Sequence, residues 1–272
     1  MKIIIAQTAG FCMGVRRVVD LAVDTASAET QGNVYTLGPL IHNKQTMEML
    51  YKRGVQTIES DNVPSSKSTV MVRAHGVPPK ILNDYEERGH KIIDGTCPKV
   101  KTVHKVIQKY RRQGYSIIIT GDEGHAEVIG LQGYAGDKGY LIGSVDDIKK
   151  LPSLQKICLV SQTTFDRKVV DSIAEKIKTA FSDSEIVIRK TICSATDKRQ
   201  EETEQLAREV DAMIVDGGKH SANTLRLAAL SKKYSSVCLH IETESEIDWD
   251  KISHCNTVRI TAGASTPNWM IK

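Results

Sequence analysis

Short apolar runs alternate with amphipathic segments along this chain of 272 residues. Eleven of the runs are four or five residues long and rich in β-branched residues, as is typical of strands buried on both faces of a sheet. They lie at 3–6, 34–37, 70–74, 91–94, 116–120, 140–143, 157–160, 186–189, 213–216, 237–241 and 258–261. Strands separated by helices at this spacing predict right-handed βαβ units and mainly parallel sheets.

Three of the segments between the runs show the apolar spacing of a helix with one buried face. The first extends from Val15 to Ala26, the second from Val100 to Tyr110 and the third from Val169 to Phe181. Eleven strands would make an unusually large open sheet, so several small sheets are expected. The predicted fold class is α/β, built from small modules with mainly parallel sheets.

The loops that follow the predicted strands hold nearly all candidate reactive residues. Ligands of parallel sheets bind beyond the carboxyl ends of the strands, where loops lead into helices. In chain order the loops include AGFCMG, GPLIHN, HGVPP, GTCPKV, GDEGHAEV, SQTT, KTICSATD, GGKHSANT and AGASTPNW.

Three of the six cysteines lie in these loops, each directly before a predicted helix: Cys12, Cys97 and Cys193. The N-terminus of a helix favours a thiolate over a thiol. The three positions are separated by nearly equal lengths of chain, which suggests three similar modules that each contribute one thiolate to a common centre. The expected modules are residues 1–96, 97–192 and 193–272.

A site formed by three thiolates is compatible with more than one metal centre. They could bind zinc with an open fourth position, or a 4Fe-4S cluster with one iron that has no protein thiolate. Packing under a turn is the alternative for any single cysteine. Cys158 and Cys238 lie inside apolar runs, and Cys255 precedes a strand without a helix start, so these three are predicted to be structural.

Histidines, an acid and hydroxyl groups accompany the cysteines in the loops. His42, His75 and His125 occupy equivalent loop positions, and Glu127 follows His125 by two residues, where a carboxylic acid beside an imidazole can deliver a proton. Hydroxyl and amide side chains that could bind a phosphate at helix N-termini are Ser221, Asn223, Ser265 and Thr266. The alternative role for the latter group is helix capping.

Composition places the chain among ordinary globular proteins, with 40% hydrophobic and 26% charged residues and a net charge of +4. The apolar run near the N-terminus is too short for a signal peptide, no stretch approaches a membrane span, and a cytoplasmic location without disulfides is expected.

One predicted helical face carries a row of basic residues: Lys101, Lys105, Lys109 and Arg112. The row predicts a solvated surface, and docking of an acidic partner is the weaker alternative. Nucleic acid is not an expected partner, because no aromatic residues lie among these basic ones.

Two other classes of protein share some of these features. A transferase acting on a nucleotide sugar would use similar glycine-rich loops but would not need the three cysteines. An iron–sulfur or metal sensor would need the cysteines but would give Glu127 no role.

The ordered set of motifs resembles the LytB family of 4-hydroxy-3-methylbut-2-enyl diphosphate reductases. The motifs are GFCMGV, GPLIHN, AHGV, DGTCPKV, GHAEV, SQTT, TIC, GGKHSANT and AGASTP, and they occur in order between residues 10 and 269. Two positions depart from the family pattern. Ala126 replaces the proline of GHPEV, and Ala222 replaces the second serine before the asparagine, which removes one hydroxyl.

The resemblance implies a pseudo-threefold trefoil of α/β modules around a 4Fe-4S cluster with one open iron, held by Cys12, Cys97 and Cys193. It also implies that the substrate diphosphate is held by His42, His75, His125, Ser221, Asn223 and Ser265. Glu127 and Thr163 are implied to lie near the hydroxymethyl group of the substrate, and His125, Glu127 and Thr163 are the implied catalytic residues.

The implied reaction is the last step of the methylerythritol phosphate pathway of isoprenoid biosynthesis. Two electrons from ferredoxin or flavodoxin remove the hydroxyl group as water and give isopentenyl or dimethylallyl diphosphate. Hydroxide is a poor leaving group, so the reaction needs a Lewis acid on the oxygen and a nearby proton donor, for which Glu127 is the candidate.

Overall fold

A computed structural model describes residues 1–29, 33–59, 62 and 64–271. The described residues form three four-stranded sheets, and every strand pair within these sheets is parallel, as predicted. The chain divides into two compact units. The first unit comprises Met1–Arg16, Ile41–Met49 and Cys193–Lys272, and the second comprises Arg17–Leu40 and Leu50–Ile192.

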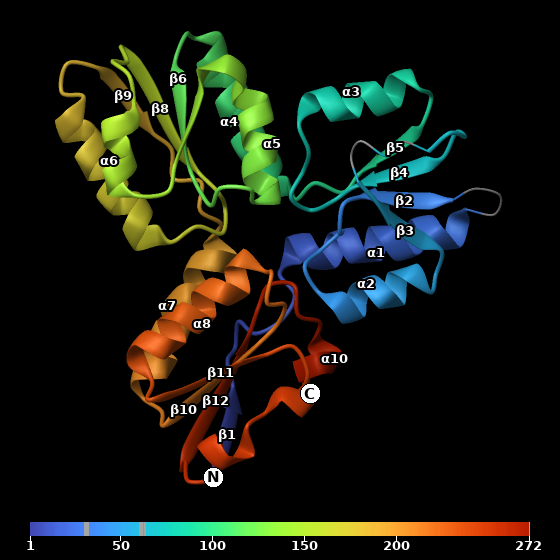
Figure 1. The fold of residues 1–272 in the computed structure, drawn as a ribbon, viewed down its shortest axis with the longest axis vertical. Coiled ribbons are helices and arrows are strands. Elements are labelled where there is room, and N and C mark those ends of the chain that lie inside the picture. Colours follow the sequence, from blue (N-terminus) through green and yellow to red (C-terminus); the bar gives the residue numbers. More distant parts are fainter. Residues whose placement is uncertain (30–32, 60–61, 63, 272) are drawn as a thin grey trace. The chain divides into compact units, whose positions relative to one another are not determined.

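The sheet of the first unit joins the two ends of the chain (Figure 1). Its strand order is β1-β12-β10-β11, so the first strand of the sequence pairs with the last. The strands are β1 (Lys2–Ile5), β10 (Ala212–Asp216), β11 (Val237–Ile241) and β12 (Thr257–Ala262). The helices of this part of the chain are α7 (Ser194–Arg208), α8 (Ala222–Tyr234), α9 (Trp249–Ile252) and α10 (Asn268–Ile271), with a 3-10 turn at Glu244–Glu246.

The second unit holds two sheets. One has the order β3-β2-β4-β5, with β2 (Val34–Leu37), β3 (Val55–Ile58), β4 (Thr69–Val72) and β5 (Lys91–Asp94). The other has the order β7-β6-β8-β9, with β6 (Ser116–Thr120), β7 (Gly139–Ile142), β8 (Lys156–Ser161) and β9 (Glu185–Ile188). The helices are α3 (Pro79–Glu87), α4 (Pro98–Arg112), α5 (Ala126–Ala135) and α6 (Arg167–Ala180), with 3-10 turns at Gly136–Lys138 and Val145–Lys150. Two further helices, α1 (Met13–Ala28) and α2 (Lys44–Tyr51), have residues in both units.

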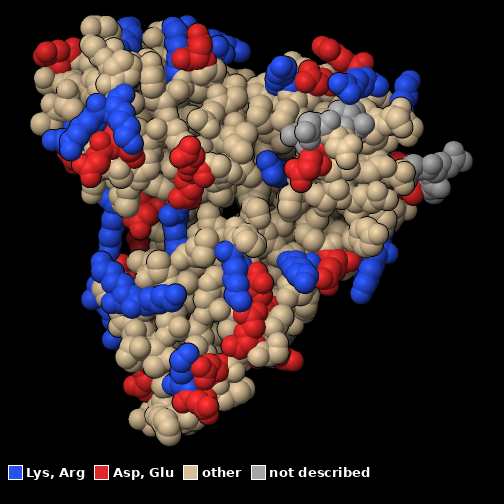
Figure 2. All heavy atoms as spheres, in the orientation of Figure 1, with Lys and Arg blue, Asp and Glu red and all other residues tan. Residues whose placement is uncertain are grey.

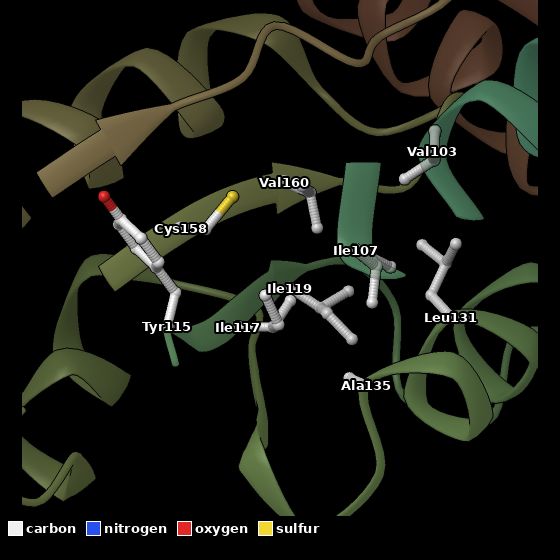
Figure 3. Packing of buried hydrophobic residues seen from close by; sticks show 9 residues of the cluster. All are labelled: Val103, Ile107, Tyr115, Ile117, Ile119, Leu131, Ala135, Cys158 and Val160. Atoms are coloured by element: carbon white, nitrogen blue, oxygen red, sulfur yellow. The ribbon is translucent and has the colours of Figure 1, made fainter. Parts of the chain in front are cut away.

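Alternation along β6 shows how one sheet builds two cores. Ile117 and Ile119 point to one face, where they pack with Ile107 of α4 and Leu131 of α5 (Figure 3). Ile118 points to the other face and packs against Ile173 of α6. Successive side chains of a strand lie on opposite faces, so an unbroken isoleucine run requires helices on both sides. Burial of each such side chain contributes about 1.5–3 kcal/mol.

Two expectations about strands were wrong. The run at 3–6 was predicted to be buried, but β1 is an edge strand, and Ile3 and Ile5 are 53% and 46% exposed. The runs at 91–94 and 186–189 were also predicted to be buried, but they form the edge strands β5 and β9, which contain no buried residue. A twelfth strand, β3, was missed because its sequence VQTI has no continuous apolar run: Val55 is buried while Gln56 and Thr57 are exposed. A strand in which apolar and polar residues are mixed is not identified by a search for continuous apolar runs.

The modules expected at 1–96, 97–192 and 193–272 remain a prediction from the sequence. The pairing of one strand departs from this division. Residues 2–5 were expected in the first module, yet they pair with Thr257–Ile260 of β12. Each of the other two sheets is formed within one continuous stretch of chain, residues 34–94 and 116–188.

Charged side chains of both signs are interspersed on the face shown in Figure 2. The row of basic residues on α4 is largely exposed, and its first member, Lys101, pairs with Asp94 at 2.6 Å. No helix within the described residues is long and apolar enough to cross a membrane.

Candidate active site

The carboxyl ends of β6 and β8 bring an acid and a hydroxyl group together in the second unit. Glu127 lies in the first turn of α5, and Thr163 follows β8. The Glu127 carboxylate accepts hydrogen bonds from the Thr163 backbone N–H at 2.7 Å and from its Oγ1 at 2.8 Å. Burial raises the pKa of Glu127 to about 7, while the two hydrogen bonds from Thr163 act in the opposite direction. A carboxyl group with this pKa can hold a proton near neutral pH and release it to a substrate.

His125 caps the same helix. Its Nδ1 accepts a hydrogen bond from the Glu127 backbone N–H at 3.2 Å, so the neutral ring carries its proton on Nε2. The ring of His75 meets that of His125 edge-on, with centroids 5.4 Å apart. The structure therefore brings together two of the three predicted histidines within the second unit.

The loop that carries His75 is also joined to Cys97. The backbone N–H of Cys97 donates to the Ala74 carbonyl at 2.9 Å, and Cys97 is the N-cap residue of α4, followed by Pro98. Gly95 is required just before it, because a Cβ at this position would lie 2.3 Å from the Val72 carbonyl oxygen. Close packing of backbone on backbone fixes the position of Cys97 at the start of its helix.

In the first unit, the end of β10 leads into α8 through a loop of polar residues. Ser221 caps α8 by accepting from the Thr224 N–H at 3.4 Å, so the capping role is present. Asn223 is only 5% exposed, and its side-chain oxygen and nitrogen have no hydrogen-bond partner among the described residues. A buried amide without partners costs free energy that a bound ligand could recover.

His42 and Ser265 meet beside this loop, within the same unit. The Ser265 hydroxyl donates to the His42 carbonyl at 3.2 Å. A Cβ on Gly218 would lie 2.4 Å from the same carbonyl oxygen, so only glycine fits there. Ser221, Asn223, Ser265 and His42 thus belong to the first unit, whereas His75 and His125 of the predicted diphosphate site belong to the second.

Cys12 and Cys193 lie in the first unit as well. Cys12 directly precedes α1, and Cys193 is the N-cap residue of α7. Both thiols act electrostatically on the buried guanidinium of Arg199. All three predicted ligands therefore occupy the beginnings of helices.

The other three cysteines differ from these. Cys158 is buried in the core between β8 and α4 (Figure 3), and burial raises its pKa to about 12. Burial also raises the pKa of Cys238, which packs against the core of the first unit, and Cys255 lies beside another hydrophobic cluster there. A thiol that resists ionisation is a poor metal ligand, so the structural role predicted for Cys158 agrees with its surroundings.

Two polar residues of the first unit were not anticipated from the sequence. Arg199 is buried on α7, and Asp216 is buried at the end of β10 with a pKa raised to about 7, first by burial and then by the charge of Glu246. Asp216 could have been recognised from the sequence, because an acidic residue ends the otherwise apolar strand β10. Arg199 stands among many charged residues of α7, where the sequence gives no sign of burial.

Comparison with known proteins identifies the family. The model of the family described as LytB protein matches residues 3–272. The chain is a member of the LytB family. This membership leaves no support for a nucleotide-sugar transferase or a metal sensor.

Relatives of this LytB chain share its full length. A 4-hydroxy-3-methylbut-2-enyl diphosphate reductase of Caldanaerobacter subterraneus is 40% identical, and the match covers all of this chain and 94% of the relative. A reductase of the same name from Aquifex aeolicus is 41% identical with the same coverage.

Solved LytB structures are similar in fold. The E-1-hydroxy-2-methyl-but-2-enyl-4-diphosphate reductase of Plasmodium falciparum matches with a TM-score of 0.91 and 29% identity, covering 98% of this chain and 85% of that one. A structure described as the terminal enzyme of the non-mevalonate pathway matches with a TM-score of 0.72 and 40% identity, covering 100% and 96%.

Proposed function

We propose that this chain is a 4-hydroxy-3-methylbut-2-enyl diphosphate reductase that forms isopentenyl and dimethylallyl diphosphate by removing the substrate hydroxyl group. Full-length relatives of that name at about 40% identity support the reaction. The observation within this chain that carries the proposal is the buried Glu127, bonded to Thr163 and holding a pKa of about 7. A reductive dehydroxylation needs such a proton donor for its leaving group.

The proposed cofactor is a 4Fe-4S cluster ligated by Cys12, Cys97 and Cys193, with one iron open to substrate. Thiolates are the ligands that iron–sulfur clusters take, and all three cysteines begin helices. Buried Arg199 beside Cys12 and Cys193 has an Nη1 without a hydrogen-bond partner among the described residues, which fits an anionic group at that place. When bound, the cluster would supply electrons and a Lewis-acidic iron for the substrate oxygen.

Glu127 is the proposed acid. With a pKa of about 7 it is about half protonated at neutral pH, and the Thr163 N–H and hydroxyl hold its carboxylate once the proton has left. His125 fixes the beginning of α5 through the Glu127 backbone and so positions the acid.

The substrate diphosphate is proposed to bind His42, His75, His125, Ser221, Asn223 and Ser265. The partnerless amide of Asn223 and the N-terminus of α8 support the part of this site that lies in the first unit. Replacement of the family's second serine by Ala222 leaves Ser221 and Asn223 to provide the polar contacts of this loop.

Ferredoxin or flavodoxin is the proposed electron donor, and a cytoplasmic location stays a prediction. Neither bears on the assay of the reaction, since a chemical reductant with a viologen mediator can replace the donor.

The proposal is tested by anaerobic purification of the full chain, followed by iron and sulfide analysis and turnover with 4-hydroxy-3-methylbut-2-enyl diphosphate. A brown protein that forms both products is expected. Cys97→Ser should lose colour and turnover, whereas Cys158→Ala, a change in the hydrophobic core, should keep both. A colourless, iron-free wild-type protein, or colour that survives Cys97→Ser, would overturn the proposed cofactor.

A further inference from the structure

Helix α7 holds the loop that follows β1 through the side chain of Arg199. Its Nε donates to the Thr8 carbonyl at 2.9 Å, and its Nη2 donates to both the Thr8 and the Gly10 carbonyls, the latter at 2.7 Å. The side chain is almost fully buried, at 4% exposure. A planar guanidinium that bonds two carbonyls in this way fixes both the distance and the orientation of the loop.

Glu202 lies one turn further along α7, and its carboxylate oxygens accept hydrogen bonds from the same loop. Its carboxylate accepts from the Gln7 N–H at 2.7 Å, from the Thr8 N–H at 2.9 Å and from the Thr8 hydroxyl. Arg199 and Glu202 thus bind two backbone N–H groups and two backbone carbonyls of the loop between Gln7 and Gly10. We call Arg199 and Glu202 the α7 clamp.

The two segments that the clamp joins each carry a cysteine. The loop continues from Gly10 to Cys12, whose N–H donates to the Ala264 carbonyl at 3.1 Å. Helix α7 begins directly after Cys193. Gly10 has φ +97°, and a Cβ there would lie 2.6 Å from the Asn268 side-chain oxygen, so a larger residue at this position would be strained and crowded.

The charge of Arg199 also interacts with both thiols, those of Cys12 and Cys193. Burial lowers the pKa of Arg199, and the charges of Cys12, Glu202 and Cys193 oppose that effect, so all three groups lie within its electrostatic reach. Its Nη1 is buried without a hydrogen-bond partner in the described part of the chain. A guanidinium stays protonated in proteins, so it places a fixed positive charge within electrostatic reach of Cys12 and Cys193.

We propose that Arg199 is a positioning residue which, together with Glu202, fixes Cys12 with respect to Cys193 and whose charge raises the reduction potential of the cluster they hold. This inference rests on the proposed iron–sulfur function. Positive charge near a cluster favours its reduced, more negative state, and the orientation of the ligands decides how firmly the cluster is retained.

The test compares four variants of the full chain, purified anaerobically: Arg199→Met, Arg199→Lys, Glu202→Gln and the control Arg208→Met. Arg208 is an exposed arginine of the same helix, paired with Glu204. Two quantities are measured, the reduction potential by a titration followed by electron paramagnetic resonance, and the rate at which the cluster is lost to a chelator.

Removal of the Arg199 charge should lower the potential, whereas removal of the Glu202 charge should raise it. For Arg199→Met the expected shift is at least tenfold in the reduction equilibrium, which is about 59 mV for a one-electron couple. Arg199→Lys keeps the charge but loses the planar guanidinium group. Its equilibrium constant for reduction of the cluster should therefore stay within threefold of the wild-type value. All three clamp variants should lose the cluster at least tenfold faster than Arg208→Met.

A clamp that serves only the stability of the fold would change unfolding in urea without these opposite shifts of potential. Potentials and loss rates equal to those of Arg208→Met would overturn the inference and leave the proposed function standing. A wild-type protein without iron would instead overturn the proposed function. If Arg199→Met does not fold, the loss rates of Arg199→Lys and Glu202→Gln decide the inference by the same criterion.

Discussion

Glu127 and Thr163 form a buried pair in which one carboxylate accepts two hydrogen bonds, at 2.7 and 2.8 Å, from the backbone N–H and the hydroxyl of one residue. The two residues lie after different strands of one sheet, β6 and β8, which pair directly. This arrangement keeps a proton available near neutral pH and stabilises the carboxylate after the proton leaves.

Glu127→Gln should reduce turnover by about 10²- to 10⁴-fold, because glutamine keeps the size of the side chain but cannot donate an acidic proton. Turnover of the anaerobic enzyme measures the loss, and iron content shows whether the cofactor is retained. Glu123→Gln, the same change at an exposed residue of the same loop, should leave turnover unaffected. Near-normal turnover in Glu127→Gln would exclude the carboxyl group as the acid.

Turnover should fall as the pH rises through about 7, since only the protonated form of Glu127 can act as the acid. A pH profile of turnover at saturating substrate shows this alkaline limb. A profile that stays flat from pH 6 to about 9 would contradict the assignment, because the group has no proton to give at the upper end.

The same group makes stability depend on pH. Its pKa is about 7 in the folded protein against 4.5 in the unfolded chain, so the folded state binds more protons between these values and stability falls as the pH rises across them. The loss amounts to about 3 kcal/mol. Urea unfolding at several pH values should show Glu127→Gln gaining on the wild type by that amount. An unchanged difference between the two proteins would refute the raised pKa.

Thr163→Val should move the alkaline limb of the pH profile upward by about one pH unit, because the lost hydroxyl bond stabilised the carboxylate form. Valine keeps the shape of threonine, and the backbone bond remains. Thr164→Val changes the neighbouring hydroxyl, which accepts from Gln162, and should leave the limb in place. A downward shift in Thr163→Val would show that the hydroxyl favours the protonated form.

Asn223→Ala should weaken substrate binding by about tenfold or more while changing the free energy of unfolding of the ligand-free protein by less than about 1 kcal/mol. The amide makes no hydrogen bond among the described residues, so little is lost until a ligand is present. Calorimetry with the substrate and urea unfolding measure the two effects. Asn256→Ala, at an exposed position of the same unit, is the control. A large loss of stability with unchanged binding would assign Asn223 to the fold instead.

The sequence predicted the sheets well where both faces of a strand are covered. The run around Ile118 is buried on both sides, and its strand was found with its observed bounds. β3 escaped prediction because only Val55 and, in part, Ile58 are shielded from solvent. Pairing of β1 with β12 depends on contacts across nearly the whole chain, which local periodicity does not report.

The candidate site could be predicted only where a motif marks it. Glu127 was a candidate acid because it lies two residues after His125, whereas Thr163 was supplied by the family resemblance; their hydrogen bonds follow from the pairing of β6 with β8. Arg199 lies in a helix crowded with charged residues, and its burial depends on carbonyls contributed by a loop near the other end of the chain. Long-range backbone partners of this kind leave no local signal.

The pairing of β1 with β12 sets an order on biosynthesis. A ribosome makes residues 2–5 long before it makes their partner strand at 257–262. The second unit can form while synthesis continues. The segment that leads from β1 to Cys12 cannot take its place in the sheet until β12 has been made. Iron delivered before that strand is made would find the part of the proposed site that holds Cys12 incomplete.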